Sequence, residues 1–306
     1  MSHVEHIVEC VPNFSEGRDA HCVLEIVQAM HVAGVHLLDF SMDADHNRSV
    51  VTVAGTPDAV REAAVRAVGR AAELIDLTKQ TGEHPRIGAA DVVPFVPVRG
   101  IRLEQCALLA RQAGAEIWKR YKVPSYFYEA AASRPDRALL EDVRKGQFEG
   151  LREAAMKDAS RRPDVGGPGL HPTAGASAVG ARRFLVAYNI YLDTADVSVA
   201  RTVAKQIRAS GGGMAGVKAM GVLVHGRAQV SLNITDYKAA PVGDVYQRVK
   251  GLAERQGARP VAGEIIGLIP QDAWVPESEW ARQIEGFVPE EKILELRLEH
   301  PLAWPA

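Results

Sequence analysis

Residues 82–88 (GEHPRIG) contain the side chain best suited to move protons near neutral pH. They join a long predicted helix to an apolar strand, and functional residues are commonly placed on such connections. Pro85 keeps His84 out of helical geometry, while the flanking glycines let a ligand approach the backbone closely. An imidazole in this position can act as both general acid and general base. The alternative is a solvated loop histidine with no part in catalysis.

A second polar segment contains Asp39, Asp43 and Arg48. Carboxylates can hold a histidine or a ligand, and a guanidinium can form a two-pronged bond with a carboxylate. Asp and His are also acceptable metal ligands, but their spacing here matches neither an EF-hand nor an HExxH motif. We therefore expect no metal site. The alternative is an ordinary polar loop in which Asp serves as a turn residue.

A third segment, residues 163–182, is rich in glycine, proline and alanine. It is either a flexible linker or a loop that lies against a flat ligand. Gly175 and Gly180 have the separation of a phosphate-binding loop, but Ala-Arg follows where Lys and Ser or Thr are required. No GxGxxG motif opens a helix after a strand, which argues against a dinucleotide fold. Ser177 lies in GASAV rather than GxSxG, so a nucleophile elbow is not supported.

The second half of the chain predicts the element order β-α-β-β-α-β. Strand-like runs span 184–192, 217–224, 227–234 and 261–269. One helix is predicted between Asp193 and the glycines at 211–213, and a second ends at Gly257. This order is the ferredoxin-like, or split βαβ, arrangement.

The first half begins in the same way. Its predicted strands span 6–11, 35–40, 49–53 and 92–98. A helix is predicted over 23–30, and a long one begins at Thr56-Pro57. A helix over 103–118 and a strand over 123–128 are predicted as additions.

We therefore predict an α+β protein with two tandem ferredoxin-like (βαββαβ) α/β sandwich subdomains, residues 1–180 and 181–306. A cleft between them would suit a small-molecule site. The alternative is two independently packed halves with no shared cleft.

Composition limits the function further. The 306 residues suffice for one large domain or two ordinary ones, and the net charge of −2 gives no bulk attraction to nucleic acid or membranes. No apolar run reaches the roughly 18 residues that span a bilayer, and residues 1–10 lack a signal-peptide pattern. The three cysteines are scattered, which fits a reducing cytoplasm better than a disulfide framework or a zinc site. We expect a soluble cytoplasmic protein that acts on something small.

Together these segments resemble the formiminotransferase family, and the resemblance covers nearly the whole chain in order. The matching stretches are VECVPNFSEG (8–17), NRS (47–49), GEHPR (82–86), DVVPFVP (91–97), GA (175–176), GAR (180–182), AQVSLN (228–233) and GLIP (267–270). The resemblance implies that His84 is the catalytic acid and base. It also implies a folate-binding segment formed by Gly166, Gly167, Pro168, Gly169, Leu170, His171, Pro172, Thr173, Ala174 and Gly175.

The activity that the resemblance implies is transfer of the formimino group from N-formimino-L-glutamate to N5 of tetrahydrofolate, in histidine breakdown. The products are 5-formimidoyltetrahydrofolate and L-glutamate. Tetrahydrofolate is then a co-substrate, no metal is involved, and the protein is a homodimer with folate held between the subdomains. Some family members carry tryptophan where this chain has Ala174, so ring stacking is absent there. The sequence contains no cyclodeaminase domain, so we expect another protein to process the product.

This reaction needs a group that moves two protons. N5 attacks the formimino carbon, the resulting tetrahedral intermediate loses a proton from N5, and the leaving glutamate nitrogen gains one. A single imidazole can serve both steps, at a gain of about 10²–10⁴-fold, and substrate positioning should supply as much or more. We hypothesise that Asp39 or Asp43 orients His84. Arg48, Arg86 or Arg182 is expected to bind a glutamate carboxylate.

Three other functions remain open. Formyl transfer between 5-formyltetrahydrofolate and glutamate would use the same residues. A non-catalytic folate- or amino-acid-binding module would bind without turnover, but it leaves the GEHPR segment unexplained. A serine hydrolase is weakened by the missing elbow.

Overall fold

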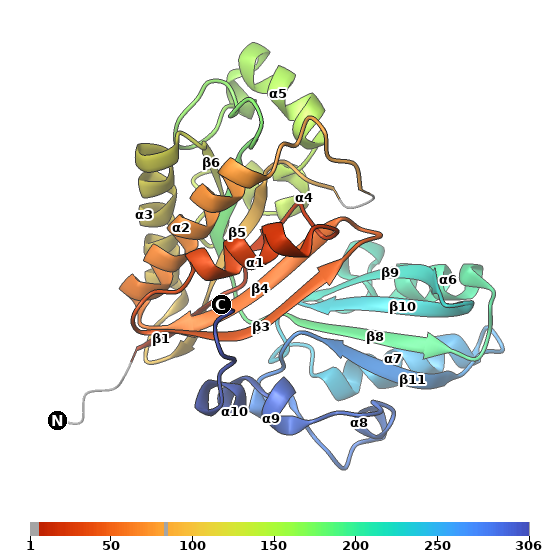
Figure 1. Ribbon diagram of the computed structural model, residues 1–306. Helices are drawn as coiled ribbons and strands as arrows, with labels where there is room; N and C mark the ends of the chain where they lie inside the picture. The colour runs from red at the N-terminus through yellow and green to blue at the C-terminus, as the bar shows by residue number, and fades with distance from the viewer. Residues whose placement is uncertain (1–5, 83–84, 306) are drawn as a thin grey trace. The chain divides into compact units, whose positions relative to one another are not determined.

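The computed structural model describes residues 6–82 and 85–305. It divides into two compact units, Met1–Arg182 with Pro301–Ala306, and Arg183–His300. Each unit has its own β-sheet and its own hydrophobic core (Figure 1). This mixture of helices with two sheets is compatible with the predicted α+β class.

The described part of the first unit contains a seven-stranded sheet. Its strands are β1 (Ile7–Cys10), β2 (Asn13–Phe14), β3 (Val35–Asp43), β4 (Arg48–Gly55), β5 (Ala90–Arg99), β6 (Ser125–Glu129) and β7 (Ser177–Ala181). Strand β4 pairs with β3 on one side. On its other side it pairs with β1 and β2, which are consecutive in the sequence. Strands β1 and β2 also pair with β5. On its other side β5 pairs with β7, and β7 pairs with β6. The pairings of β7 are parallel and the others antiparallel.

Three helices of this unit pack side by side (Figure 1). They are α1 (Ala20–Ala29), α2 (Pro57–Leu74) and α3 (Leu103–Tyr121). Helix α1 begins where the Asp19 carboxylate accepts the backbone N–H groups of His21 and Cys22. Helix α2 begins at Pro57, as predicted, because proline needs no hydrogen-bond acceptor in the first turn. Its buried alanines let the helix lie close to its neighbours.

The two faces of the first sheet carry separate cores. Successive side chains of β6 point to opposite faces, so Phe127 joins the core beneath α1 to α3 while Tyr126 and Tyr128 join a smaller one. The smaller core is covered by Val143 of α4 (Leu140–Val143) and Leu151 of α5 (Gln147–Lys157). The sequence predicts no element in this helical region, which also contains the short 3₁₀ turns Pro135–Arg137 and Ala159–Arg161.

The glycine-rich segment 163–182 is not a simple linker, because it ends in β7, a buried strand of the first sheet. Its small residues allow close packing: a Cβ atom on Gly180 would lie 2.4 Å from the ring of Tyr128. The two units meet in sequence between Arg182 and Arg183.

The second unit, described in full, contains a four-stranded antiparallel sheet in the order β11-β8-β10-β9. The strands are β8 (Val186–Leu192), β9 (Val217–Val224), β10 (Arg227–Ile234) and β11 (Pro260–Ile266). Helices α6 (Val197–Ile207) and α7 (Val242–Glu254) share its core. His225 and Gly226 both have positive φ in the turn between β9 and β10, the backbone conformation of a tight hairpin. The remaining elements are the 3₁₀ turns Ala209–Gly211 and Gln271–Ala273 and the short helices α8 (Glu279–Arg282), α9 (Pro289–Lys292) and α10 (Leu294–Glu299).

The end of the chain belongs to the first unit. The Leu302 N–H donates to the Leu37 carbonyl at 2.8 Å, and the Trp304 ring stacks on His31 with 5.0 Å between centroids. All three cysteines are free and buried. Among the described residues, no helix combines the length and the apolarity that a bilayer crossing needs.

Candidate active site

Four loops of the first unit converge near the start of strand β5. They are residues 15–19, 43–48, 75–89 and 171–176. The Gly17 N–H donates to Asn47 Oδ1 at 3.0 Å, and Asn47 Nδ2 donates to the Thr81 carbonyl at 3.0 Å. The Ala89 N–H donates to the Ala174 carbonyl at 2.9 Å. The fold therefore brings together parts of all three segments that the sequence singled out.

His84 lies outside the described residues, but the chain on both sides of it is firmly held. On one side the Leu77 N–H donates to the Thr173 carbonyl at 2.9 Å. On the other, the Phe148 N–H donates to the Arg86 carbonyl at 2.8 Å. A Cβ atom on Gly88 would lie 2.2 Å from the Ala176 carbonyl oxygen, so glycine is required there. The role of His84 stays a prediction.

The most buried charge near this loop is Asp91, which is 0% exposed. Its Oδ1 atom accepts the Ile87 N–H at 2.8 Å, and its Oδ2 atom accepts Arg48 Nη1 at 3.1 Å and Arg144 Nη2. Burial raises the pKa of Asp91, but the charges of Arg144 and Arg48 and the Ile87 hydrogen bond outweigh burial, and the net pKa is lowered. Asp91 is therefore ionised at neutral pH.

Arg48 is already engaged by the protein. Its Nε and Nη2 atoms donate to Asn13 Oδ1 at 3.0 and 2.7 Å, in addition to the bond with Asp91. Burial lowers the pKa of Arg48 to about 10, although Asp91 opposes the shift, so the guanidinium stays charged at neutral pH. Its predicted role in binding a substrate carboxylate stays a prediction.

Arg86 connects both sides of the loop to helix α5. Its Nη2 atom donates to the Gln80 carbonyl at 2.7 Å and the Leu77 carbonyl at 3.3 Å, and it pairs with Glu149 at 3.0 Å. Arg86 thus links residues 77 and 80, which precede His84, to Glu149 of α5. Arg182, at the end of β7, donates its backbone N–H to the Phe95 carbonyl at 3.1 Å.

The two predicted carboxylates lie on β3. Asp43 pairs with His46 Nδ1 at 2.7 Å, and hydrogen bonds from His46 outweigh partial burial, so the pKa of Asp43 is lowered. Asp39 is half-buried and follows a bulge in the pairing of β3 with β4. Because His84 is not described, orientation of His84 by Asp39 or Asp43 stays a prediction.

In the segment 166–175, three positions have a backbone conformation that only glycine adopts readily. Gly166, Gly167 and Gly175 have positive φ, and a Cβ atom on Gly166 would lie 2.5 Å from the Trp118 ring. The peptide bond between Gly167 and Pro168 is cis. The positive φ angles and the packing of Gly166 against Trp118 give the loop one defined path rather than that of a flexible linker.

His171 and Ala174 shape the second half of this segment. His171 exchanges two backbone hydrogen bonds with Gly175, at 2.8 and 3.1 Å, and its Nδ1 atom accepts the Ala174 N–H at 3.0 Å. Burial lowers the pKa of His171, which favours a neutral ring. The Ala174 side chain is 1% exposed and belongs to the main core, so it presents no surface on which a ring could stack.

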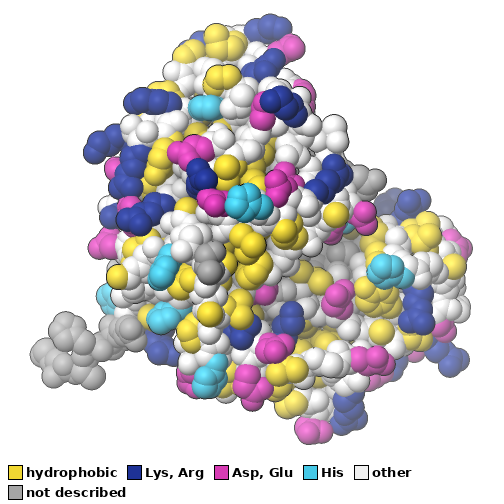
Figure 2. All heavy atoms as spheres, viewed as in Figure 1, with side chains coloured by type: hydrophobic (Ala, Val, Ile, Leu, Met, Phe, Trp, Pro, Cys, Tyr) yellow, Lys and Arg dark blue, Asp and Glu magenta, His cyan; other side chains and the backbone are white. Residues whose placement is uncertain are grey.

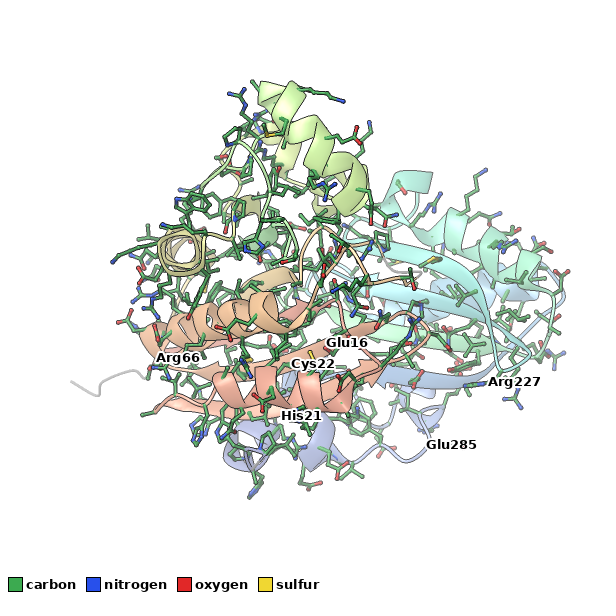
Figure 3. All side chains as sticks on the ribbon, turned by 45° about the horizontal axis from the view of Figure 1, so that its top comes forward. Glu16, His21, Cys22, Arg66, Arg227 and Glu285 are labelled. Carbon is green, nitrogen blue, oxygen red and sulfur yellow. The ribbon has the colours of Figure 1, made fainter. Side chains whose placement is uncertain are left out.

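Several residues of this network carried no prediction from the sequence. Glu16, marked in Figure 3 near the start of α1, accepts the backbone N–H groups of Arg18 and Asp19 at 2.8 and 2.9 Å. Gln80 Nε2 donates to the other Glu16 oxygen at 2.6 Å. Glu16 lies within the matching stretch 8–17, which could have identified it. Arg144 lies in no matching stretch.

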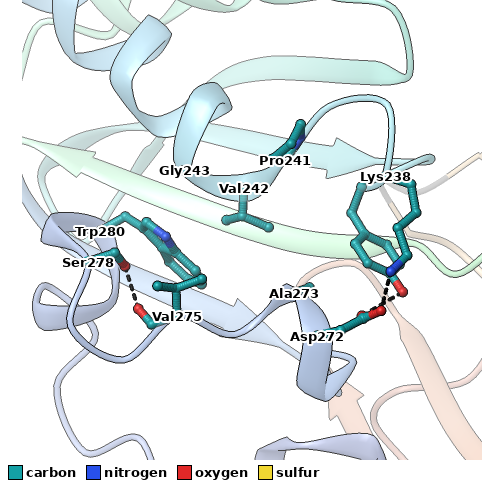
Figure 4. Close-up of a pocket in the computed structure, with 10 residues that line it drawn as sticks. Lys238, Pro241, Val242, Gly243, Asp272, Ala273, Val275, Ser278 and Trp280 are labelled. Carbon is teal, nitrogen blue, oxygen red and sulfur yellow. Dashed lines mark hydrogen bonds and ion pairs between the residues drawn. The ribbon is translucent and has the colours of Figure 1, made fainter.

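The second unit has a cavity of about 350 Å³ that contains no predicted site residue (Figure 4). Trp280, Val242 and Asp272 line it, and Asp272 accepts the Tyr237 hydroxyl at 2.8 Å and pairs with Lys238. Residues 6–82 and 85–305 contain no cluster of His, Cys, Asp or Glu arranged to hold a metal ion. On the face shown in Figure 2, acidic and basic side chains are interspersed.

Comparison with known proteins gives matches to both units. A family model described as the formiminotransferase domain, N-terminal subdomain, matches residues 7–182, and one described as the formiminotransferase domain matches residues 187–300.

Three relatives show how far the similarity extends. A glutamate formimidoyltransferase of Streptococcus pyogenes serotype M1 is 43% identical over 95% of this chain and 98% of its own. One of Thermoplasma acidophilum is 42% identical over 96% of this chain and 97% of its own. A formimidoyltransferase-cyclodeaminase of Gallus gallus is 38% identical over 97% of this chain but 55% of its own length.

Proposed function

The chain belongs to the formiminotransferase family, and from this membership we propose that it is a glutamate formimidoyltransferase. It transfers the formimino group of N-formimino-L-glutamate to N5 of tetrahydrofolate and releases L-glutamate. The observation that carries this proposal is the 43% identity to a glutamate formimidoyltransferase over nearly the full length of both chains. Tetrahydrofolate is a co-substrate of the reaction.

His84 is the proposed acid and base. N5 of tetrahydrofolate attacks the formimino carbon, and His84 takes the proton that N5 loses. The bond between that carbon and the glutamate nitrogen then breaks, and His84 returns the proton to the leaving nitrogen. The place of His84 in the GEHPR stretch (82–86) supports this assignment, because an imidazole can give and take a proton near neutral pH.

The residues that hold the substrates are proposed on the same basis. Folate binds residues 166–175, a loop to which the positive-φ glycines give one defined path. Arg48, Arg86 or Arg182 contacts a glutamate carboxylate, and Asp39 or Asp43 orients His84.

We also propose that residues 1–180 and 181–306, the bounds drawn from the sequence, contain one ferredoxin-like subdomain each. In the first unit the neighbouring strands are β3, β4, β1 and β5, and in the second they are β9, β10, β8 and β11. Each set has the same order of pairing, and in each the elements run β-α-β-β-α-β. The proposal includes that the protein is a homodimer in the cytoplasm.

The activity is tested with purified protein, tetrahydrofolate and N-formimino-L-glutamate. We expect free L-glutamate to appear in step with 5-formimidoyltetrahydrofolate. A parallel reaction contains L-glutamate and 5-formyltetrahydrofolate, and we expect it to be slower. Preference for the formyl donor would replace the proposed reaction with formyl transfer. Binding of both substrates without product would identify a non-catalytic binding module.

A further inference from the structure

Arg144 follows helix α4 and points its guanidinium to the buried carboxylate of Asp91. Its side chain is 13% exposed. Among the described residues, Asp91 is the one hydrogen-bonding partner of this side chain, whose Nε atom is buried without an acceptor. The Asp91 oxygen that it contacts also accepts Arg48 Nη1. Arg144 thus shares the charge of Asp91 with Arg48 and, within the part of the chain that the structure describes, keeps unused donors.

A second buried arginine of the same region shows what a purely structural role requires. The Arg137 side chain is 6% exposed and pairs with Asp164 at 2.5 Å. Its Nη2 atom also donates to the carbonyls of Ser160 and Arg162, at 3.0 and 2.5 Å, and its guanidinium lies 5.1 Å from the centre of the Tyr126 ring. Both terminal nitrogens of Arg137 thus have partners, whereas among the described residues the Arg144 side chain has Asp91 alone.

The position of Arg144 connects it to the loop that carries His84. One oxygen of Asp91 accepts Arg144, and the other accepts the N–H of Ile87, three residues after His84. A guanidinium with unused donors beside this loop is suited to a carboxylate, which it can bind through two parallel hydrogen bonds.

We propose that Arg144 binds the α-carboxylate of the amino-acid donor and so places its reacting nitrogen beside the His84 loop. This proposal rests on the proposed formimino transfer. Both substrates carry carboxylates, but those of tetrahydrofolate are separated from N5 by the aminobenzoyl group. In the donor, the α-carboxylate is attached to the carbon that bears the reacting nitrogen. A carboxylate site next to the proton-transfer loop therefore fits the donor.

Arg144→Gln removes both the charge and the paired N–H donors of the guanidinium, and Arg144→Lys retains the charge alone. In both variants Asp91 keeps Arg48 and the Ile87 N–H, so we expect both to fold. Loss of a charged hydrogen-bonded contact should raise the KM for N-formimino-L-glutamate by about 10–100-fold in the glutamine variant. The KM for tetrahydrofolate should change less than about threefold, and lysine should restore part of the loss. Arg137→Gln, the matched control, should lower the unfolding temperature without a donor-specific change in KM.

A donor analogue without the α-carboxylate, N-formimino-4-aminobutyrate, isolates the contact. The wild-type protein should use N-formimino-L-glutamate with a higher kcat/KM than this analogue. In the glutamine variant the ratio of the two kcat/KM values should be at least about 10-fold smaller. Equal discrimination by both proteins would overturn the proposal. So would a rise in the KM for tetrahydrofolate alone, or a loss of thermal stability with unchanged KM values. Should the wild type show no turnover, the proposed function fails, and calorimetric titration with L-glutamate still tests Arg144: binding unaffected by Arg144→Gln would refute the site.

Discussion

Asp91→Asn tests whether a buried ionic cluster holds the loop that carries the proposed acid and base. The asparagine can still accept the Ile87 N–H, but its NH₂ group would face the donors of Arg48 and Arg144. Two buried guanidiniums would then lose a shared carboxylate. Removing one partner of a buried ion pair costs about 3–5 kcal/mol, and we expect a loss of this size at pH 7.

The pH dependence of that loss follows from the lowered pKa of Asp91. A carboxyl group with a lower pKa in the folded than in the unfolded chain stabilises the fold above its unfolded pKa. That contribution disappears as the pH falls through the folded value. The unfolded pKa of aspartate is about 3.9, so the difference between wild type and Asp91→Asn should be constant near neutrality and shrink in acid.

The assay is urea unfolding of both proteins between pH 7 and pH 3. Because the two units have separate cores, unfolding can occur in more than one step, and hydrogen exchange of the first unit identifies where stability is lost. Asp136→Asn is the control, since Asp136 forms an exposed pair with Arg134 and should matter little. Equal stability of Asp91→Asn and wild type at pH 7 would refute the reasoning.

Two further predictions concern buried side chains. Ala174→Trp should lower the free energy of unfolding by about 1–3 kcal/mol, because the alanine is 1% exposed in the main core. An unchanged melting temperature of the variant in calorimetry would contradict this. The thiols of Cys10, Cys22 and Cys106 should resist alkylation at pH 7 until the protein unfolds, because burial raises the pKa of each, to about 11 for Cys22 and about 12 for Cys106. Rapid labelling of Cys106 in the folded protein would show that this thiol is accessible.

The elements with regular hydrophobic spacing were predictable from the sequence. Helix α2 has a proline in its first turn and a buried stripe at helical spacing, and β9 and β10 have the predicted bounds. Strand β7 was missed because its residues, SAVGA, are small and buried on both faces, so no alternation of polar and apolar side chains marks it. Its packing depends on Tyr128, which is remote in sequence.

The candidate site was predictable where it lies in the recognised segments. The segments 82–88, 39–48 and 163–182 were each singled out, and the fold brings parts of them together. The partners of Asp91 were not predictable, because Arg144 is 53 positions away in a region without a recognisable motif. Tertiary structure alone makes that contact visible. The predicted carboxylate binders Arg48 and Arg86 are also anchors of the loops, a role that residue type cannot reveal.

The central claim, that His84 moves the protons of formimino transfer, is tested most directly by glutamate release from His84→Ala. The control is His21→Ala, since His21 is an exposed residue of α1 (Figure 3). We predict a fall in kcat of about 10²–10⁴-fold in the folded His84 variant, partial recovery with added imidazole, and an unaffected control. Near-normal turnover by folded His84→Ala would contradict the account.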